Sequence, residues 1–417
     1  MHLDSRYEYG GIQKISLVST MSEASESFLS NVPPMGIYET LYAFQDAFGT
    51  PMGKIGTHPW SQGFPLTTQL PEGPEMPANI YVNAEDLKYP KAWGLPDLRE
   101  AIAGYYNHYY SAGIDYENIM VFAGGRPGLI ALLMFLQQDI HIRIASTEYT
   151  PYYDMLRLLK REYSLVGSHV DNSFFPTVQD YANPGFADRN LVMLSNPCNP
   201  TGVTRTGHEL KSLVNKASYG SFGLLIDEAY ELFHIPPTSA LEYIDDINDS
   251  NLFISGAATK GLQAPGIRIG WIVAAKRYIE ILGNFSSFGM GGVSRPSQLY
   301  ALDLLQQVRT DMSHRAVPTF YASQRKRYAE AFTDLGLEVF SGDGGFYHWC
   351  MLPGELTAAE FNNRLFKHGA AILKGTDCDM KRQGNKSPLS QFFRFSFGPL
   401  QPESFKSDIK ILRKVLY

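Results

Sequence analysis

Lys260 is the residue whose type and position could do the most distinctive chemistry in this sequence. The apolar run Asn251–Ser255 predicts a buried strand, and a turn of small residues then leads to Lys260. Arg268 follows it, before a second apolar strand over Trp271–Ala275. A lysine held at a strand end beside another cation loses its proton more readily, and a free amine can condense with a carbonyl compound. Taken alone, the segment also fits an exposed lysine near a structural arginine.

Two further predicted strands end in polar side chains. Phe222–Ile226 leads to Asp227, and Leu191–Ser195 leads into a turn of two Asn-Pro pairs that contains Asn199. In open α/β sheets, ligands bind at the carboxyl ends of the strands. There, Asp227 could keep a pyridine nitrogen protonated, and the Asn199 amide could donate to a ring hydroxyl. A helix N-cap for Asp227 and a plain turn around Asn199 are the alternatives.

Two other segments could bind anions. A strand over Ile119–Ala123, the turn Gly124-Gly125-Arg126 and a helix over Leu129–Gln137 follow one another. Backbone N–H groups at the start of such a helix, with an arginine beside them, form a phosphate site. Arg394 alternates with aromatic residues along a predicted strand over Phe392–Phe397. A buried guanidinium needs an anion, so Arg394 predicts either a bound carboxylate or a structural ion pair.

The order of these segments resembles the class I/II aminotransferases, which are fold-type I pyridoxal-phosphate enzymes like aspartate aminotransferase. The resemblance runs from about Tyr89 to Gly398, and Tyr89–Arg99 looks like the family's Tyr…Gly-x-x-x-Leu-Arg opening. It implies an α/β large domain with a mostly parallel, seven-stranded type of sheet flanked by helices, and a smaller α+β domain. It also implies pyridoxal 5'-phosphate as cofactor and a homodimer with shared active sites.

The same resemblance implies a role for each matching residue. Lys260 would bond the cofactor as an imine and move the substrate's α-proton, with Asp227 and Tyr230 as the other catalytic residues. Arg394 would pair with the α-carboxylate of the substrate, beside Asn199 and Gly36. The expected cofactor-binding residues are Gly124, Gly125, Arg126, Tyr149, Asn199, Asp227, Tyr230, Thr259, Lys260, Arg268 and, from the neighbouring subunit, Tyr89.

The implied activity is transfer of the amino group of an α-amino acid to a 2-oxo acid. The sequence departs from the family at Ala257, where a hydroxyl residue is common, and Arg126 would compensate at the phosphate. The polar stretch Lys374–Ser387, expected near the substrate mouth, is also atypical. Another reaction of the same cofactor therefore stays open: β- or γ-elimination, cyclisation or oxygen-dependent deamination. A non-catalytic ligand sensor is less favoured, because the chain has no added basic segment.

Composition agrees with a globular enzyme. The chain has 417 residues, of which 44% are hydrophobic and 19% charged, and a net charge of −6. That charge favours neither a nucleic acid nor a membrane as partner. Three separated cysteines and the histidine spacing predict no disulfide framework and no metal site. The chain starts without a signal-peptide pattern, which predicts a cytoplasmic protein.

The chain is long enough for more than one core, and changes in composition predict three parts. Residues 1–64 would be an N-terminal segment that packs on the small domain. Residues 65–315 would form the large, cofactor-binding domain, with strands and helices in alternation, and residues 316–417 the small domain. Helical apolar spacing is predicted over Ser297–Val308 and again over Thr319–Leu335.

Overall fold

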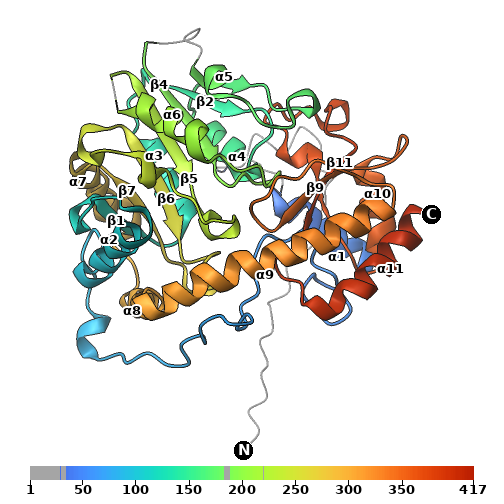
Figure 1. Cartoon of the computed structure of the whole chain (residues 1–417), viewed down its shortest axis with the longest axis horizontal. Coiled ribbons are helices and arrows are strands. Elements are labelled where there is room, and N and C mark those ends of the chain that lie inside the picture. Colours follow the sequence, from blue (N-terminus) through green and yellow to red (C-terminus); the bar gives the residue numbers. More distant parts are fainter. Residues whose placement is uncertain (1–28, 30–33, 183–187, 219) are drawn as a thin grey trace, which may run out of the picture.

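The structure is a computed structural model that describes residues 29, 34–182, 188–218 and 220–417. Figure 1 shows two lobes, with the long helix α9 (Gln307–Asp334) running from one to the other. The larger lobe holds a sheet covered by helices, and the smaller lobe holds a second sheet with the C-terminal helix.

A seven-stranded sheet forms the centre of the larger lobe, in the order β1-β7-β6-β5-β4-β2-β3. Neighbouring strands from β6 through β3 pair in parallel, whereas β7 is antiparallel to both β1 and β6. Strands buried on both faces need continuous apolar runs, which is why these segments were recognisable in the sequence. The strands are β1 (Ile119–Phe122), β2 (His141–Ala145), β3 (Tyr163–Val166), β4 (Asn190–Ser195), β5 (Phe222–Asp227), β6 (Leu252–Ala257) and β7 (Gly270–Ala274).

Helices cover both faces of this sheet. Side chains of alternate strand residues pack against α2, α6 and α8 on one face and against α3, α4 and α7 on the other. The predicted α/β layering is therefore confirmed. The helices of this lobe are α2 (Pro96–Tyr110), α3 (Gly125–Phe135), α4 (Thr150–Leu158), α5 (Val178–Ala182), α6 (Gly207–Ala217), α7 (Lys276–Phe285) and α8 (Arg295–Leu304).

The smaller lobe contains an antiparallel sheet in the order β10-β11-β9-β8. Its apolar core joins this sheet to α9, α10 and α11, and aromatic side chains are prominent in it. Arg394 lies on the second strand of this sheet, opposite Trp349 and Leu373. The elements are α1 (Ile37–Phe48), β8 (Glu338–Val339), β9 (Tyr347–Met351), α10 (Ala358–Phe366), β10 (Leu373–Lys374), β11 (Phe392–Ser396) and α11 (Phe405–Leu416).

Helix α9 is longer than the sequence pattern indicates. It begins at Gln307, before the predicted start at Thr319, and continues through Pro318 in its interior. The predicted boundary between residues 315 and 316 would therefore fall inside a helix, and the three domain ranges stay a prediction. Most of the first 33 residues lie outside the described part of the chain.

None of the helices in the described ranges has both the length and the apolar character needed to cross a lipid bilayer. The cytoplasmic location stays a prediction.

Candidate active site

A cavity of about 320 Å³ opens where the parallel strands of the large sheet end. It is bordered by the carboxyl ends of β4, β5 and β6, by the turn before α3 and by the turn before α4. Most of the residues predicted from the sequence meet there. The lining residues are Gly125, Arg126, Leu129, Tyr149, Ser195, Asn199, Asp227, Ala229, Tyr230, Ala257, Thr259, Lys260, Pro265 and Arg268.

The Lys260 amine lies in this cavity, just after β6. Its Nζ donates a hydrogen bond to the carbonyl oxygen of Gly63 and lies 5.7 Å from the ring centre of Tyr230. Burial, together with the positive charges of Arg394 and Arg126, lowers the pKa of Lys260 to about 7, and the carboxylate of Asp227 opposes this shift. A substantial fraction of the amine is therefore unprotonated, and nucleophilic, near neutral pH.

Asp227, the last residue of β5, places a carboxylate in the same cavity. One oxygen accepts a hydrogen bond from the Tyr152 hydroxyl at 3.0 Å, and the other accepts from the backbone N–H of Ala229 at 3.2 Å. Burial raises the pKa of Asp227, while these donors and Lys260 oppose the rise. The two donors fix the orientation of the carboxylate, which suits it to accept from a protonated ring nitrogen.

The side of the cavity at the start of α3 has uncapped backbone N–H groups and two arginines. No side chain caps this helix, so the N–H groups of its first turn remain for a ligand. Gly124 has a φ of 100°, and a side chain there would overlap the guanidinium of Arg268. Arg268 donates to the Pro265 carbonyl at 2.9 Å, and Arg126 donates to the Tyr149 hydroxyl at 2.8 Å. Since neither arginine pairs with a carboxylate among the described residues, both remain available to a phosphate.

Arg394 reaches toward this site from the smaller lobe. It is 4% exposed, and its hydrogen-bond acceptors are neutral: the Asn199 side-chain oxygen at 2.8 Å and the Ser61 carbonyl at 2.7 Å. Within the described part of the chain, its Nε has no hydrogen-bond partner. A buried guanidinium without an acidic partner keeps its charge uncompensated, so Arg394 suits an anion that enters from outside. The structural ion pair that was the alternative for Arg394 is absent from the described residues.

Besides Arg394, three predicted residues do not line the cavity. Gly124 lies directly beside it, at the N-cap of α3. Tyr89 is 93% exposed on the outer surface of the chain. Gly36 forms the N-cap of α1, and a Cβ added to it would lie 3.5 Å from the Thr150 side chain.

A buried acid under the cavity was missed in the sequence. Glu148 is 2% exposed. One of its carboxylate oxygens accepts from the Tyr149 N–H and the Ser195 hydroxyl, each at 2.9 Å, and the other accepts from the Ser195 N–H at 3.1 Å. The Ser195 hydroxyl in turn accepts from the N–H of Asn199 at 3.0 Å. Burial raises the pKa of Glu148 to about 7. This network holds the turn of Tyr149 against the turn of Asn199.

The atypical stretch Lys374–Ser387 packs against the same turn. The Met380 N–H donates to the Ser146 carbonyl at 3.0 Å, and the Arg382 guanidinium donates to the Thr150 carbonyl at 3.1 Å. The stretch thus connects the smaller lobe to the segment that carries Tyr149, and its predicted position near the mouth of the site stays a prediction.

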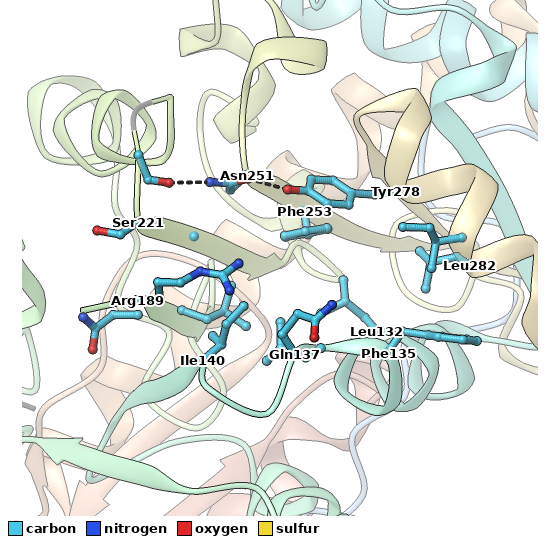
Figure 2. A pocket seen from close by; sticks show the side chains of 16 residues that line it. Leu132, Phe135, Gln137, Ile140, Arg189, Ser221, Asn251, Phe253, Tyr278 and Leu282 are labelled. Atoms are coloured by element: carbon cyan, nitrogen blue, oxygen red, sulfur yellow. Dashed lines mark hydrogen bonds between the residues drawn. The ribbon is translucent and has the colours of Figure 1, made fainter. Parts of the chain in front are cut away.

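A second cavity lies at the opposite, amino-terminal ends of the strands of the large sheet. It has a volume of about 150 Å³ and is lined by apolar residues such as Leu132, Phe253 and Leu282. Figure 2 shows the Tyr278 hydroxyl pointing at Asn251, whose amide donates in turn to the Gly220 carbonyl at 3.1 Å. Among the described residues, its lining contains no lysine, carboxylate or histidine, so this cavity offers no chemistry comparable to that around Lys260.

An α/β fold with a cavity that combines a nucleophilic amine, a fixed carboxylate and unpaired cations suits an enzyme that binds a phosphorylated carbonyl cofactor. The chain belongs to the class I and II aminotransferase family, whose sequence model matches residues 59–404. Enzymes of this family use pyridoxal phosphate, so the family and the cofactor expected from the sequence are confirmed.

Individual relatives are distant. An aspartate aminotransferase from Pyrococcus horikoshii is 23% identical over 290 residues, which cover 68% of this chain and 73% of the relative. An LL-diaminopimelate aminotransferase from Dehalococcoides mccartyi is 24% identical over 316 residues, covering 74% and 80%. A double mutant of Thermus thermophilus aspartate aminotransferase superimposes with a TM-score of 0.77 at 20% identity, over 96% of this chain and 100% of that chain. The last comparison confirms the fold.

Proposed function

We propose that this aminotransferase bonds pyridoxal phosphate through Lys260 and transfers the amino group of an α-amino acid to a 2-oxo acid. The observation that carries the proposal is the environment of one amine. Lys260 Nζ lies in a cavity with Asp227, and its pKa is lowered to about 7. Relatives named for aspartate, LL-diaminopimelate and glutamine all use amino acids, which supports the substrate class.

The residues around the cavity fit this cofactor. Arg126, Arg268 and the first N–H groups of α3 would hold its phosphate, since they lack acidic partners. Asp227 would bond the ring nitrogen, and Asn199 and Tyr230 the ring hydroxyl. Tyr149 would cover one ring face, and Thr259 would lie beside the phosphate. When bound, the cofactor supplies an electron sink for the charge left on the substrate when its α-proton leaves.

Lys260 would act as the proton carrier of the reaction. With its pKa near neutrality, the amine can accept the proton from the substrate's α-carbon and release it again within the same site. Its bond to the Gly63 carbonyl and its contact with Tyr230 keep Nζ in the cavity. A positioned general base of this kind contributes about 10²–10⁴-fold to the rate.

Arg394 would bind the α-carboxylate of either substrate. Its free Nε and its neutral acceptors leave the guanidinium charge uncompensated until a carboxylate enters. Asn199 would orient the Arg394 guanidinium, since the Asn199 side-chain oxygen accepts a hydrogen bond from one guanidinium nitrogen. Gly36, at the N-cap of α1, would border the substrate.

The enzyme would work as a homodimer with shared sites. The stretch before α2 exposes large apolar side chains, with Tyr81 83% exposed, Leu87 78% and Tyr89 93%. Such side chains favour burial against a second copy of the chain. In that dimer, Tyr89 would reach the phosphate of the neighbouring site.

Replacing Lys260 by alanine tests the proposal. The variant should lose turnover and the chromophore that borohydride reduces, because no other amine is expected to bond the cofactor. Lys276→Ala, which removes an exposed lysine paired with Asp115 and Glu117, is the matched control and should keep both. An active Lys260→Ala variant would exclude the assignment. A requirement for a 2-oxo acid acceptor would separate transamination from elimination, cyclisation and oxygen-dependent deamination, none of which needs one.

A further inference from the structure

Tyr347, the first residue of β9, connects two groups of the proposed site. Its side chain is fully buried. Its hydroxyl forms a hydrogen bond with the hydroxyl of Tyr230, and its ring lies under the guanidinium of Arg394, whose central carbon is 4.2 Å from the ring centre. One side chain of the smaller lobe thus contacts both a residue expected to bind the cofactor and the residue expected to bind the substrate carboxylate.

The number of available protons decides which hydroxyl donates in the hydrogen bond between Tyr230 and Tyr347. Each hydroxyl has a single proton to donate and can also accept. If the Tyr230 proton goes to an acceptor in the cavity, the Tyr347 proton is the one left for the bond between them. Tyr347 then donates to Tyr230, and a hydroxyl that accepts a hydrogen bond becomes a stronger donor itself.

The contact with Arg394 has a different basis. A guanidinium over an aromatic ring is attracted to the negative face of the ring, and the flat contact restricts the rotation of the arginine. The hydrogen bonds of Arg394 to Asn199 and Ser61 use two of its three nitrogens. The Tyr347 ring sets the plane of the guanidinium, and with it the direction from which a carboxylate can bind.

The surroundings indicate that the position of Tyr347 is constrained by the site and not only by core packing. A Cβ added at Gly63 would overlap the Tyr347 hydroxyl, and the Gly63 carbonyl is also the acceptor for Lys260 Nζ. Phe346 of the same segment lies 5.8 Å from Lys260 Nζ. Gly63 therefore contacts both Tyr347, at the start of β9, and Lys260.

We infer that Tyr347 is a positioning residue with two separable effects: its hydroxyl strengthens Tyr230 as a hydrogen-bond donor, and its ring orients Arg394 for the substrate carboxylate. The inference depends on the proposed function, because it gives Tyr230 and Arg394 the roles stated above. Besides Arg394, the titratable groups around the pair are Lys260, Arg126, Tyr149 and Cys378.

Two substitutions separate the effects. Tyr347→Phe removes the hydroxyl and keeps the ring, whereas Tyr347→Leu removes both. A matched control is Tyr321→Phe, which removes a buried hydroxyl of the same core that bonds the backbone of Leu66 and Gly398. The readouts are the absorbance of the bound cofactor as pH is varied, and KM and kcat for whichever amino acid serves as donor.

Tyr347→Phe should raise the midpoint of the absorbance titration by about 0.5–1 pH unit, the effect of one weakened hydrogen bond. Without the Tyr347 hydroxyl, Tyr230 donates a weaker hydrogen bond to the ring oxygen of the cofactor. The negative charge on that oxygen is then less stabilised, so the proton beside it is lost only at higher pH. KM should stay within about twofold of the wild type. Tyr347→Leu should show the same shift and, in addition, raise KM about 3- to 10-fold, since the cation–π contact is lost.

The outcomes distinguish this inference from the proposed function. If the wild type titrates and Tyr347→Phe gives the same curve, the role of the hydroxyl is wrong. If Tyr347→Leu leaves KM unchanged, the role of the ring is wrong. A wild type that forms no titrating chromophore would overturn the proposed function, and this inference with it. Circular dichroism of each variant checks folding, and should Tyr347→Leu fail to fold, Tyr347→Phe still decides the first effect.

Discussion

Burial and the charges around Lys260 determine whether its amine can react. Burial is the largest cause of its lowered pKa, and the positive charge of Arg394 is the next. The amine loses its proton above a pH of about 7, so the rate at which cofactor-free protein captures pyridoxal phosphate covalently should rise with pH and level off above that value. Removing a neighbouring positive charge makes protonation easier and raises the pKa.

Arg394→Gln should therefore shift the midpoint of that rate profile to higher pH. The rate is measured by stopped-flow absorbance from pH 5.5 to about 9.5, a range that brackets the expected midpoint. Arg189→Gln serves as control, because Arg189 pairs with Asp139 at the opposite edge of the sheet. A midpoint that is identical in all three proteins would contradict the electrostatic explanation.

Turns at strand ends, more than the strands themselves, hold the reactive groups. The turn between β1 and α3 depends on Gly124, whose φ of 100° and close approach to Arg268 leave no space for a side chain. Gly124→Ala should displace the Arg268 guanidinium and weaken the binding of pyridoxal phosphate by about 10-fold or more, because a phosphate contact is worth roughly 1.5–3 kcal/mol. The strained backbone should also lower the free energy of unfolding by about 1 kcal/mol or more.

Gly104→Ala is the matched control for that change. Gly104 lies on α2 with no atom near the added Cβ, and alanine is the better helix former, so this variant should keep its affinity and gain up to about 1 kcal/mol in unfolding free energy. Cofactor affinity by equilibrium dialysis and stability by urea titration check both variants. Equal affinities for Gly124→Ala and the wild type would exclude the proposed phosphate turn.

At the scale of the whole molecule, the proposed dimer makes a quantitative prediction. If Tyr89 completes the neighbouring site, Tyr89→Ala and Lys260→Ala are each impaired alone, but a mixed dimer has one site with both residues intact. Unfolding and refolding the two variants together in equal amounts should restore about a quarter of the wild-type activity, since half of the dimers are mixed and half of their sites are complete. No recovery in dimers shown to be mixed would contradict the shared site.

Much of the site could be predicted because of its place in the fold. The apolar runs of β4, β5 and β6 are recognisable as buried strands, and the polar residues just beyond them had to meet at one edge of the sheet. Asp227, Asn199 and Lys260 were found in this way.

The remaining residues of the site have no periodic signature. Glu148 is a single acid in a short polar stretch, and its burial depends on Ser195 from a distant strand. Tyr347 belongs to an aromatic strand that looks like ordinary core, and only the folded chain brings it to Tyr230. The start of α9 was missed because Pro318 suggests a break in the helix, whereas the helix continues through it.

The most direct test is to locate the cofactor on the chain. The protein is loaded with pyridoxal phosphate, reduced with borohydride, digested and examined by mass spectrometry. The mass of the reduced cofactor should appear on the peptide that contains Lys260, at that lysine. An adduct at a different lysine, or none in a fully loaded protein, would contradict the proposed chemistry.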